Sequence, residues 1–171
     1  MSADLLNASN TTNSSQAAIA TLVQQLAAQL SQRQWRLALA ESCTGGLIAA
    51  HCTALAGSSH WFEAGFVTYS NAAKTAQLGV PAALITEHGA VSEPVAAAMA
   101  QGALLCSGAT IAASVTGVAG PAGGTPAKPV GTVCFAWALG NKVITVTQQF
   151  QGDRAAVREQ AVLHALRQMI A

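Results

Sequence analysis

Apolar residues recur at helical spacing near both ends of the chain and in short strand-like runs between them. Near the start, five apolar positions lie three or four residues apart or side by side, at Ile19, Leu22, Val23, Leu26 and Leu30. This spacing predicts a helix from Gln16 to Leu30, and similar spacing after Gly152-Asp153 predicts a final helix. Residues 1–15 are rich in Asn, Ser and Thr, so we expect a polar, disordered tail there.

The short apolar runs predict strands at 36–40, 65–69, 109–115, 132–139 and 142–149. Gly140-Asn141 separates the last two runs as a hairpin turn does. Further helices are expected after Gly46, after a cap at Ser70 or Asn71 with Lys74 in the first turn, after Pro81, and from Ser92-Glu93-Pro94 through Cys106. Helices that alternate with strands, followed by a late hairpin, predict a single α/β domain with a mixed sheet over 16–171.

Charge and composition narrow the classes of partner. Charged residues make up 9% of the chain, the net charge is +1, and the basic residues do not cluster, which argues against a nucleic-acid binder. No apolar run approaches the roughly 20 residues of a membrane span, and the start does not resemble a secretory signal. The four cysteines lack metal-ligand or disulfide spacing. We therefore expect a cytoplasmic protein that acts on a small molecule, without a metal, a membrane or a nucleic acid.

Candidate chemistry concentrates between Gly57 and Lys74. A serine becomes a nucleophile when a base removes its proton, and a desolvated lysine can be that base. Ser59 precedes the aromatic pair Trp61-Phe62, while Tyr69 and Lys74 lie five residues apart across an expected strand-to-helix turn. Spacing alone leaves another interpretation open, in which Lys74 is a solvated surface residue and Tyr69 merely packs.

Three further segments have ligand-binding character. In Glu41-Ser42-Cys43-Thr44-Gly45-Gly46, the glycines allow close approach of a ligand, and Ser42 and Thr44 either donate to an anion or cap the next helix. Cys43 at a helix start is expected to have a lowered thiol pKa and is an alternative nucleophile. The glycine-rich loop from Thr116 and Gly117 onward suits a ribose or phosphate. Arg154 either grips an anion or is a free surface residue.

Taken in order, these segments resemble the CinA C-terminal domain family over residues 16–170. The resemblance is carried by seven segments: 40–46, 57–59, 65–71 with Lys74, 88–94, 117–121, 128–133 and 152–154. It implies a three-layer α/β/α fold in its stand-alone form, usually homo-oligomeric. The implied activity is hydrolysis of the carboxamide of nicotinamide mononucleotide to nicotinic acid mononucleotide and ammonia, in pyridine-nucleotide recycling and without a cofactor. A non-catalytic nucleotide-binding module is the alternative.

The resemblance also implies residue roles. Ser59 would be the nucleophile, Lys74 its general base and Tyr69 an aid to proton transfer, although the choice between Ser59 and Ser42 as nucleophile stays open. The residues implied in substrate binding are Ser42, Thr44, Gly45, Gly46, Thr116, Gly117 and Arg154. Two positions depart from the family pattern, because Ala64 replaces an arginine after Trp-Phe-Glu and Ala122 replaces an aspartate after Gly-Pro. These departures put loop ordering, substrate affinity and the oligomer contact in question.

Overall fold

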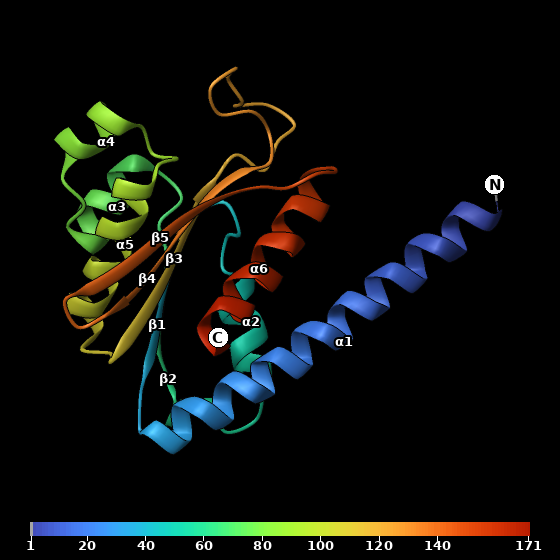
Figure 1. Cartoon of the computed structure of the whole chain (residues 1–171), viewed down its shortest axis with the longest axis horizontal. Coiled ribbons are helices and arrows are strands. Elements are labelled where there is room, and N and C mark those ends of the chain that lie inside the picture. Colours follow the sequence, from blue (N-terminus) through green and yellow to red (C-terminus); the bar gives the residue numbers. More distant parts are fainter. Residues whose placement is uncertain (1) are drawn as a thin grey trace.

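A mixed five-stranded sheet lies between two layers of helices (Figure 1). The computed structural model describes residues 2–171, with side chains from residue 14 onward. The helices are α1 (Ser2–Arg33), α2 (Leu47–Ala54), α3 (Asn71–Leu78), α4 (Ala82–His88), α5 (Glu93–Ser107) and α6 (Arg154–Ile170), with a 3₁₀ turn η1 (Ser58–His60). The strands are β1 (Leu37–Glu41), β2 (Phe62–Val67), β3 (Ile111–Gly117), β4 (Thr132–Leu139) and β5 (Lys142–Gln149).

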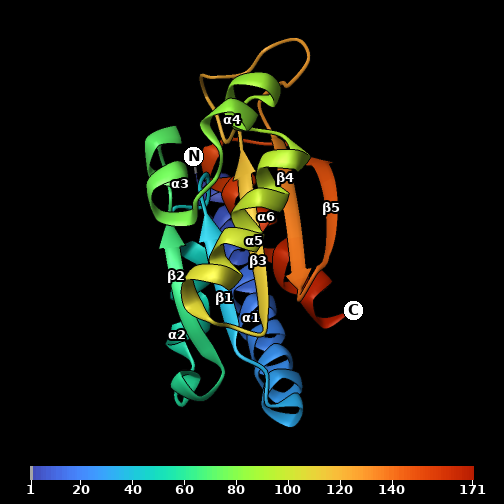
Figure 2. The ribbon, with the colours of Figure 1, turned by 90° about the vertical axis from the view of Figure 1, so that its left-hand side faces the viewer.

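The strand order β2-β1-β3-β4-β5 creates one edge where three parallel strands end together. Strand β1 is parallel to both β2 and β3, whereas β4 and β5 are antiparallel to their neighbours. We call the end of the sheet where β1, β2 and β3 finish the carboxyl edge; the loop between β3 and β4 extends beyond it (Figure 2). In open α/β sheets, ligands bind outside the carboxyl ends of parallel strands.

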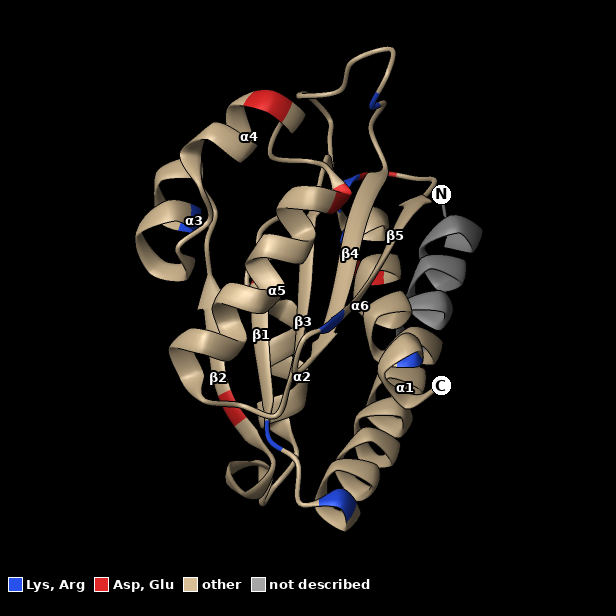
Figure 3. Ribbon diagram, turned by 60° about the vertical axis from the view of Figure 1, so that its left-hand side comes forward, with Lys and Arg blue, Asp and Glu red and all other residues tan. Residues whose placement is uncertain are grey.

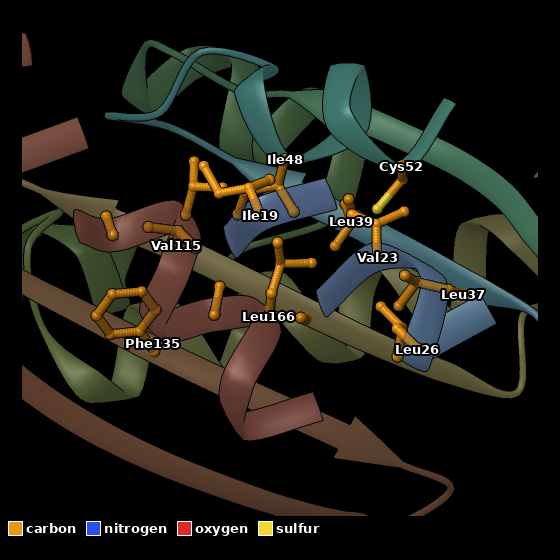
Figure 4. Close-up of a cluster of buried hydrophobic side chains, with 14 of the residues drawn as sticks. Ile19, Val23, Leu26, Leu37, Leu39, Ile48, Cys52, Val115, Phe135 and Leu166 are labelled. Atoms are coloured by element: carbon orange, nitrogen blue, oxygen red, sulfur yellow. The ribbon is translucent and has the colours of Figure 1, made fainter. Parts of the chain in front are cut away.

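Strand β1 shows how the two layers are held to the sheet. It is buried along its whole length, and its alternate residues point to opposite faces. Leu37 and Leu39 pack into a cluster with α1, α2 and α6, which includes Leu166 (Figure 4). Ala38 and Ala40 pack against α3, α4 and α5 on the other face. This arrangement confirms the predicted three-layer α/β/α fold.

Helix α1 is longer than the spacing of apolar residues predicts. It begins at Ser2 rather than near Gln16, because the segment contains neither glycine nor proline to stop it. It ends where Gln34 adopts a left-handed conformation with φ 54°. The expected polar tail is thus helical in its backbone from Ser2, its side chains at 1–13 lie outside the described part, and a domain boundary near residue 16 stays a prediction.

The other elements follow the sequence closely. The hairpin of β4 and β5 turns at Gly140-Asn141 as expected, and Ser70, Ser92 and Asp153 cap α3, α5 and α6. Strand β2 begins earlier than predicted, at Phe62. Within the described residues, none of the helices has the length and apolar character that a membrane span requires.

Candidate active site

The carboxyl edge places three hydroxyl-bearing residues side by side at the ends of neighbouring strands. Glu41, the last residue of β1, is in register with Val115 of β3, so the next residues, Ser42 and Thr116, are adjacent. Ser42 donates its N–H to Val115 O at 2.9 Å, and Thr68, which follows β2, donates its N–H to Glu41 O at 2.8 Å. Ser42, Thr68 and Thr116 are all buried. This row depends on strand register and is invisible in the linear sequence.

Lys74 reaches this row from α3. The Ser70 side chain accepts from Ala73 N at 3.0 Å and caps the helix, which sets Lys74 in its first turn as predicted. Lys74 is the only charged residue of α3 (Figure 3), and it is 1% exposed. Its Nζ donates to Ser42 Oγ at 3.0 Å and to Thr68 O at 2.9 Å.

Burial lowers the pKa of Lys74 below its usual 10.5, because a low-polarity environment disfavours the ammonium form. Among the residues with described side chains, no carboxylate lies within ion-pair distance of the amine to oppose this shift. The alternative interpretation, in which Lys74 is a solvated surface lysine, is therefore wrong. A desolvated amine hydrogen-bonded to a serine hydroxyl is the arrangement that a serine–lysine hydrolase requires.

Glu41 occupies the anion-binding end of α2. Its carboxylate accepts from Gly46 N at 3.0 Å, Ile48 N at 3.2 Å and Ala49 N at 2.8 Å. Gly45 and Gly46 have φ values of +62° and +92°, so they allow the tight turn that brings these N–H groups to Glu41. The chain itself thus fills the helix start where we expected a ligand anion. An acidic residue just before a glycine-rich turn was the available signal.

Thr44 does not cap the next helix, because the residue before α2 is Gly46. Its Oγ1 is buried and has no hydrogen-bond partner within the part of the chain that the structure describes, so its predicted role in binding an anion stays a prediction. The backbone carbonyl of Thr44 instead accepts from Leu47 N at 3.3 Å and from Arg158 Nη2 at 2.8 Å.

Cys43 is a poor nucleophile in this structure. Burial raises its pKa to about 12, and hydrogen bonds from the backbone N–H groups of Cys43 and Thr44 offset only part of that effect. The expected lowering of the thiol pKa at a helix start is wrong, because loss of solvent outweighs the favourable backbone groups. Little thiolate is present near neutral pH, which disfavours the alternative with Cys43 as nucleophile.

Ser59 lies at the opposite end of the sheet from Lys74. It belongs to η1, which precedes β2, whereas Lys74 follows that strand. The six residues of β2 separate them, a distance of about 20 Å at 3.3 Å per residue. Figure 2 shows the connection from α2 to β2 at one end of the sheet and α3 at the other. Within one chain the structure does not form the pair of Ser59 and Lys74, and Ser42 stands in its place.

Arg154 connects the two loops on either side of the Ser42 strand end. Asp153 caps α6 by accepting from Ala156 N at 2.9 Å, which puts Arg154 in the first turn. Its Nη2 donates to Tyr69 OH and its Nη1 to Gly120 O, both at 2.8 Å. Tyr69 follows β2 and Gly120 follows β3, the two neighbours of β1. Tyr69 and Arg154, which the sequence places far apart, are thus neighbours at the carboxyl edge.

The remaining predicted site residues have mainly structural contacts. Thr116 Oγ1 donates to Ala90 O at 2.8 Å, and a Cβ on Gly117 would lie 2.7 Å from a methyl of Val133. Of the two departures from the family pattern, Ala64 is half-buried in β2 and Ala122 is exposed in the loop after β3. A surface groove of about 430 Å³ lies between α3 and α4, and none of the predicted site residues lines it.

Comparisons with known proteins agree with one another. The model of the family described as CinA C-terminal domain matches residues 19–171. Nicotinamide-nucleotide amidohydrolase PncC of Pseudomonas putida is 55% identical over 148 residues, which cover 86% of this chain and 92% of the relative. A protein of the same name from Enterobacter agglomerans is 53% identical over 143 residues, covering 83% and 87%.

Other relatives are longer, and solved structures share the fold. A CinA-like protein of Mycolicibacterium gilvum is 55% identical over 150 residues, covering 85% of this chain but 35% of the relative. The competence/damage inducible protein CihA of Agrobacterium tumefaciens has a TM-score of 0.87 at 41% identity, covering 90% of this chain and 94% of that structure. The competence damage-inducible protein A of Klebsiella pneumoniae also has a TM-score of 0.87 at 41% identity, with coverages of 89% and 94%.

Proposed function

The chain belongs to the CinA C-terminal domain family, and from this we propose that it is a nicotinamide-nucleotide amidohydrolase. It would hydrolyse the carboxamide of nicotinamide mononucleotide to nicotinic acid mononucleotide and ammonia. The two relatives that carry this activity in their names support the proposal, because the chain spans 92% and 87% of their lengths. We include in it a cytoplasmic homo-oligomer that serves pyridine-nucleotide recycling and needs no cofactor.

The observation that carries the chemistry is the buried contact between Lys74 Nζ and Ser42 Oγ at 3.0 Å. A neutral amine has two N–H groups and one lone pair. With one N–H donated to Thr68 O, the lone pair is free to accept the Ser42 proton. Ser42, rather than Ser59, is therefore the nucleophile in this proposal.

The reaction follows from that geometry. Lys74 takes the hydroxyl proton as Ser42 Oγ attacks the carboxamide carbon, and the resulting ammonium then protonates the departing nitrogen, which leaves as ammonia. The acyl group stays on Ser42 as an ester. Lys74 next removes a proton from water, whose oxygen attacks the ester carbon, and returns that proton to Ser42 as the carboxylic acid product leaves. Each proton has a donor and an acceptor, and the enzyme is regenerated.

Backbone N–H groups of the same turn would stabilise the tetrahedral oxyanion. Those of Ser42, Gly45 and Gly46 already donate to Val115 O, Ser42 O and Glu41 and are not available. Those of Cys43 and Thr44 contact, among the described residues, only the Cys43 sulfur, a weak acceptor that an oxyanion would readily replace. A single donor of this kind is typically worth about 3 kcal/mol in the transition state.

The groups around Ser42 would bind the rest of the nucleotide. Arg154 is positively charged and lies in the first turn of α6. Its partners are Tyr69 OH and Gly120 O, and none of the described carboxylates pairs with it. A phosphate would offer it stronger, charge-assisted hydrogen bonds. Release from Arg154 would leave the Tyr69 hydroxyl free to aid proton transfer, while Thr116 and Gly117 border the site from β3.

Ammonia release from nicotinamide mononucleotide tests the proposal. The wild-type protein is expected to release it, and Ser42→Ala is expected to lower kcat by at least about 10³-fold because the nucleophile is absent. Ser59→Ala is the matched control, since it makes the same chemical change at the opposite end of the sheet. Loss of activity in Ser59→Ala with full activity in Ser42→Ala would overturn the assignment of the nucleophile.

The same assay separates the enzyme from a non-catalytic module. A nucleotide-binding module would show calorimetric affinity for nicotinamide mononucleotide and form no ammonia over a long incubation. That result would reject the amidohydrolase and leave the family assignment intact.

A further inference from the structure

Arg158, which has no part in the chemistry above, contacts the turn that carries Ser42. We call residues 42–46 the nucleophile turn. Arg158 lies on α6, one helical turn after Arg154, and its Nη2 donates to Thr44 O at 2.8 Å. The same Nη2 is the nearest atom to the position of a Cβ on Gly45, at 3.5 Å. One guanidinium thus lies against two consecutive residues of the turn.

Gly46 N is held by the Glu41 carboxylate, but the internal support of the nucleophile turn is weak at Thr44. Gly45 N donates to Ser42 O at 3.0 Å, but the bond from Leu47 N to Thr44 O is long, at 3.3 Å. Two consecutive left-handed glycines leave the backbone many alternative conformations. The hydrogen bond from Arg158 is shorter and has a charged donor, so it is the stronger restraint on the Thr44 carbonyl.

The state of the guanidinium supports a role at the turn. Arg158 is half-buried, its Nε is buried without a partner, and no carboxylate lies within ion-pair distance among the described side chains. Partial burial of a cation without a counter-ion costs free energy unless hydrogen bonds compensate for the lost solvent. Its hydrogen-bond acceptor is the Thr44 carbonyl.

We propose that Arg158 is a positioning residue for the hydrolase. By fixing the peptide that joins Thr44 to Gly45, it keeps Ser42 Oγ at hydrogen-bond distance from Lys74 Nζ and orients the N–H groups of Cys43 and Thr44. A displacement of about 1 Å at reacting atoms can lower a rate by about 10²-fold. The kinetic consequence rests on the proposed function, whereas the structural consequence does not.

The kinetic test compares Arg158→Met, Arg158→Lys and Arg167→Met. Arg158→Met is expected to lower kcat by about 10- to 100-fold with KM for nicotinamide mononucleotide nearly unchanged, because Arg158 acts on the nucleophile rather than on bound substrate. Arg158→Lys keeps a charged donor and should recover part of that loss. Arg167→Met removes an exposed arginine from the last turn of the same helix and should match the wild type. A wild-type kcat in Arg158→Met would overturn the proposal.

A second readout follows the turn itself. Iodoacetamide labelling of Cys43, quantified by peptide mass spectrometry, reports how often the buried turn opens. In Arg158→Met the labelling rate should rise by about tenfold, because local opening becomes more frequent. Buried Cys134 on β4 serves as the internal reference and should not change. Unchanged Cys43 labelling would also overturn the positioning role.

The kinetic assay and the Cys43 labelling distinguish failure of the proposed function from failure of the positioning role of Arg158. If the wild type forms no ammonia, the proposed function fails, yet Cys43 labelling still decides whether Arg158 holds the turn. Folding of the variant is expected to survive, because Arg158 lines a surface groove of about 280 Å³ with His51 and Glu159. A thermal melt close to that of the wild type verifies this, and Arg158→Lys provides a milder variant.

Discussion

Replacing Lys74 with methionine should change how the stability of the protein depends on pH. Lys74 is 1% exposed, and burial lowers its pKa below 10.5, the value to which it returns on unfolding. Between the lowered pKa and 10.5, the unfolded chain therefore binds a proton that the folded chain does not. Burial of the charged amine therefore costs stability at low pH; this penalty shrinks as pH rises across the window and returns in full as pH falls to the lowered pKa.

The expected slope of the free energy of unfolding with pH follows from the difference of one bound proton between the unfolded and the folded chain. Within the window, the free energy of unfolding of the wild type should rise relative to Lys74→Met by up to about 1.4 kcal/mol per pH unit. The two lost hydrogen bonds, to Ser42 Oγ and Thr68 O, shift the variant by an amount that does not vary with pH over this range. The slope of the difference is thus the informative quantity.

Urea denaturation at half-unit steps from pH 6 to pH 10.5 measures this slope. Lys142→Met, which removes an exposed lysine at the start of β5, is the matched control and should follow the wild type in parallel. A constant difference between wild type and Lys74→Met across the whole range would refute the lowered pKa. The argument for a neutral amine base would fail with it.

The same titration should appear in the kinetics. The value of kcat/KM should increase with pH through the lowered pKa of Lys74, because only the neutral amine accepts the Ser42 proton. Lys74→Met should lower kcat by about 10²- to 10⁴-fold, the usual contribution of a general base. If the midpoint of the pH dependence of kcat/KM coincides with the lower end of the pH window seen in the unfolding measurements, both pH dependences come from the titration of Lys74.

Three other changes test the surroundings of the site. Glu41→Gln should lower the free energy of unfolding by about 1–3 kcal/mol in urea denaturation, because the amide nitrogen would face backbone donors; an unchanged midpoint would contradict this. Gly102→Ala should lower it by about 1–3 kcal/mol, since its Cβ would lie 2.0 Å from Leu78 O, and a stable variant would reject that packing. Cys43→Ala should keep ammonia release within about tenfold of the wild type, whereas complete loss would restore the thiol as nucleophile.

Local signals in the sequence were sufficient for most of the fold. Helix caps at Ser70, Ser92 and Asp153 and the hairpin turn at Gly140-Asn141 depend on neighbouring residues, so their chemistry is visible in the chain. The start of α1 could not be predicted in this way, because a run of weak helix formers without glycine or proline leaves the first residue of the helix undetermined.

The candidate site was predictable residue by residue but not as an arrangement. Lys74, Ser42, Tyr69 and Arg154 were all singled out, yet the family resemblance suggested Ser59 as the partner of Lys74 and left Ser42 open as the alternative. Strand β2 lies between Ser59 and Lys74 and takes the chain from one end of the sheet to the opposite end. The contact that forms, between residues 32 positions apart, depends on β1 and β2 lying parallel and in register.

The end of β1 separates two groups that must not meet. Consecutive strand residues point to opposite faces, so Glu41 reaches the N–H groups of α2 while Ser42 reaches Lys74 of α3 on the other side of the sheet. A carboxylate beside Lys74 would stabilise its ammonium form, raise its pKa and remove the base. A register shift of one residue would exchange the two side chains and produce that pairing. The alternation at Glu41-Ser42, rather than either residue alone, therefore makes a lysine base feasible at this edge.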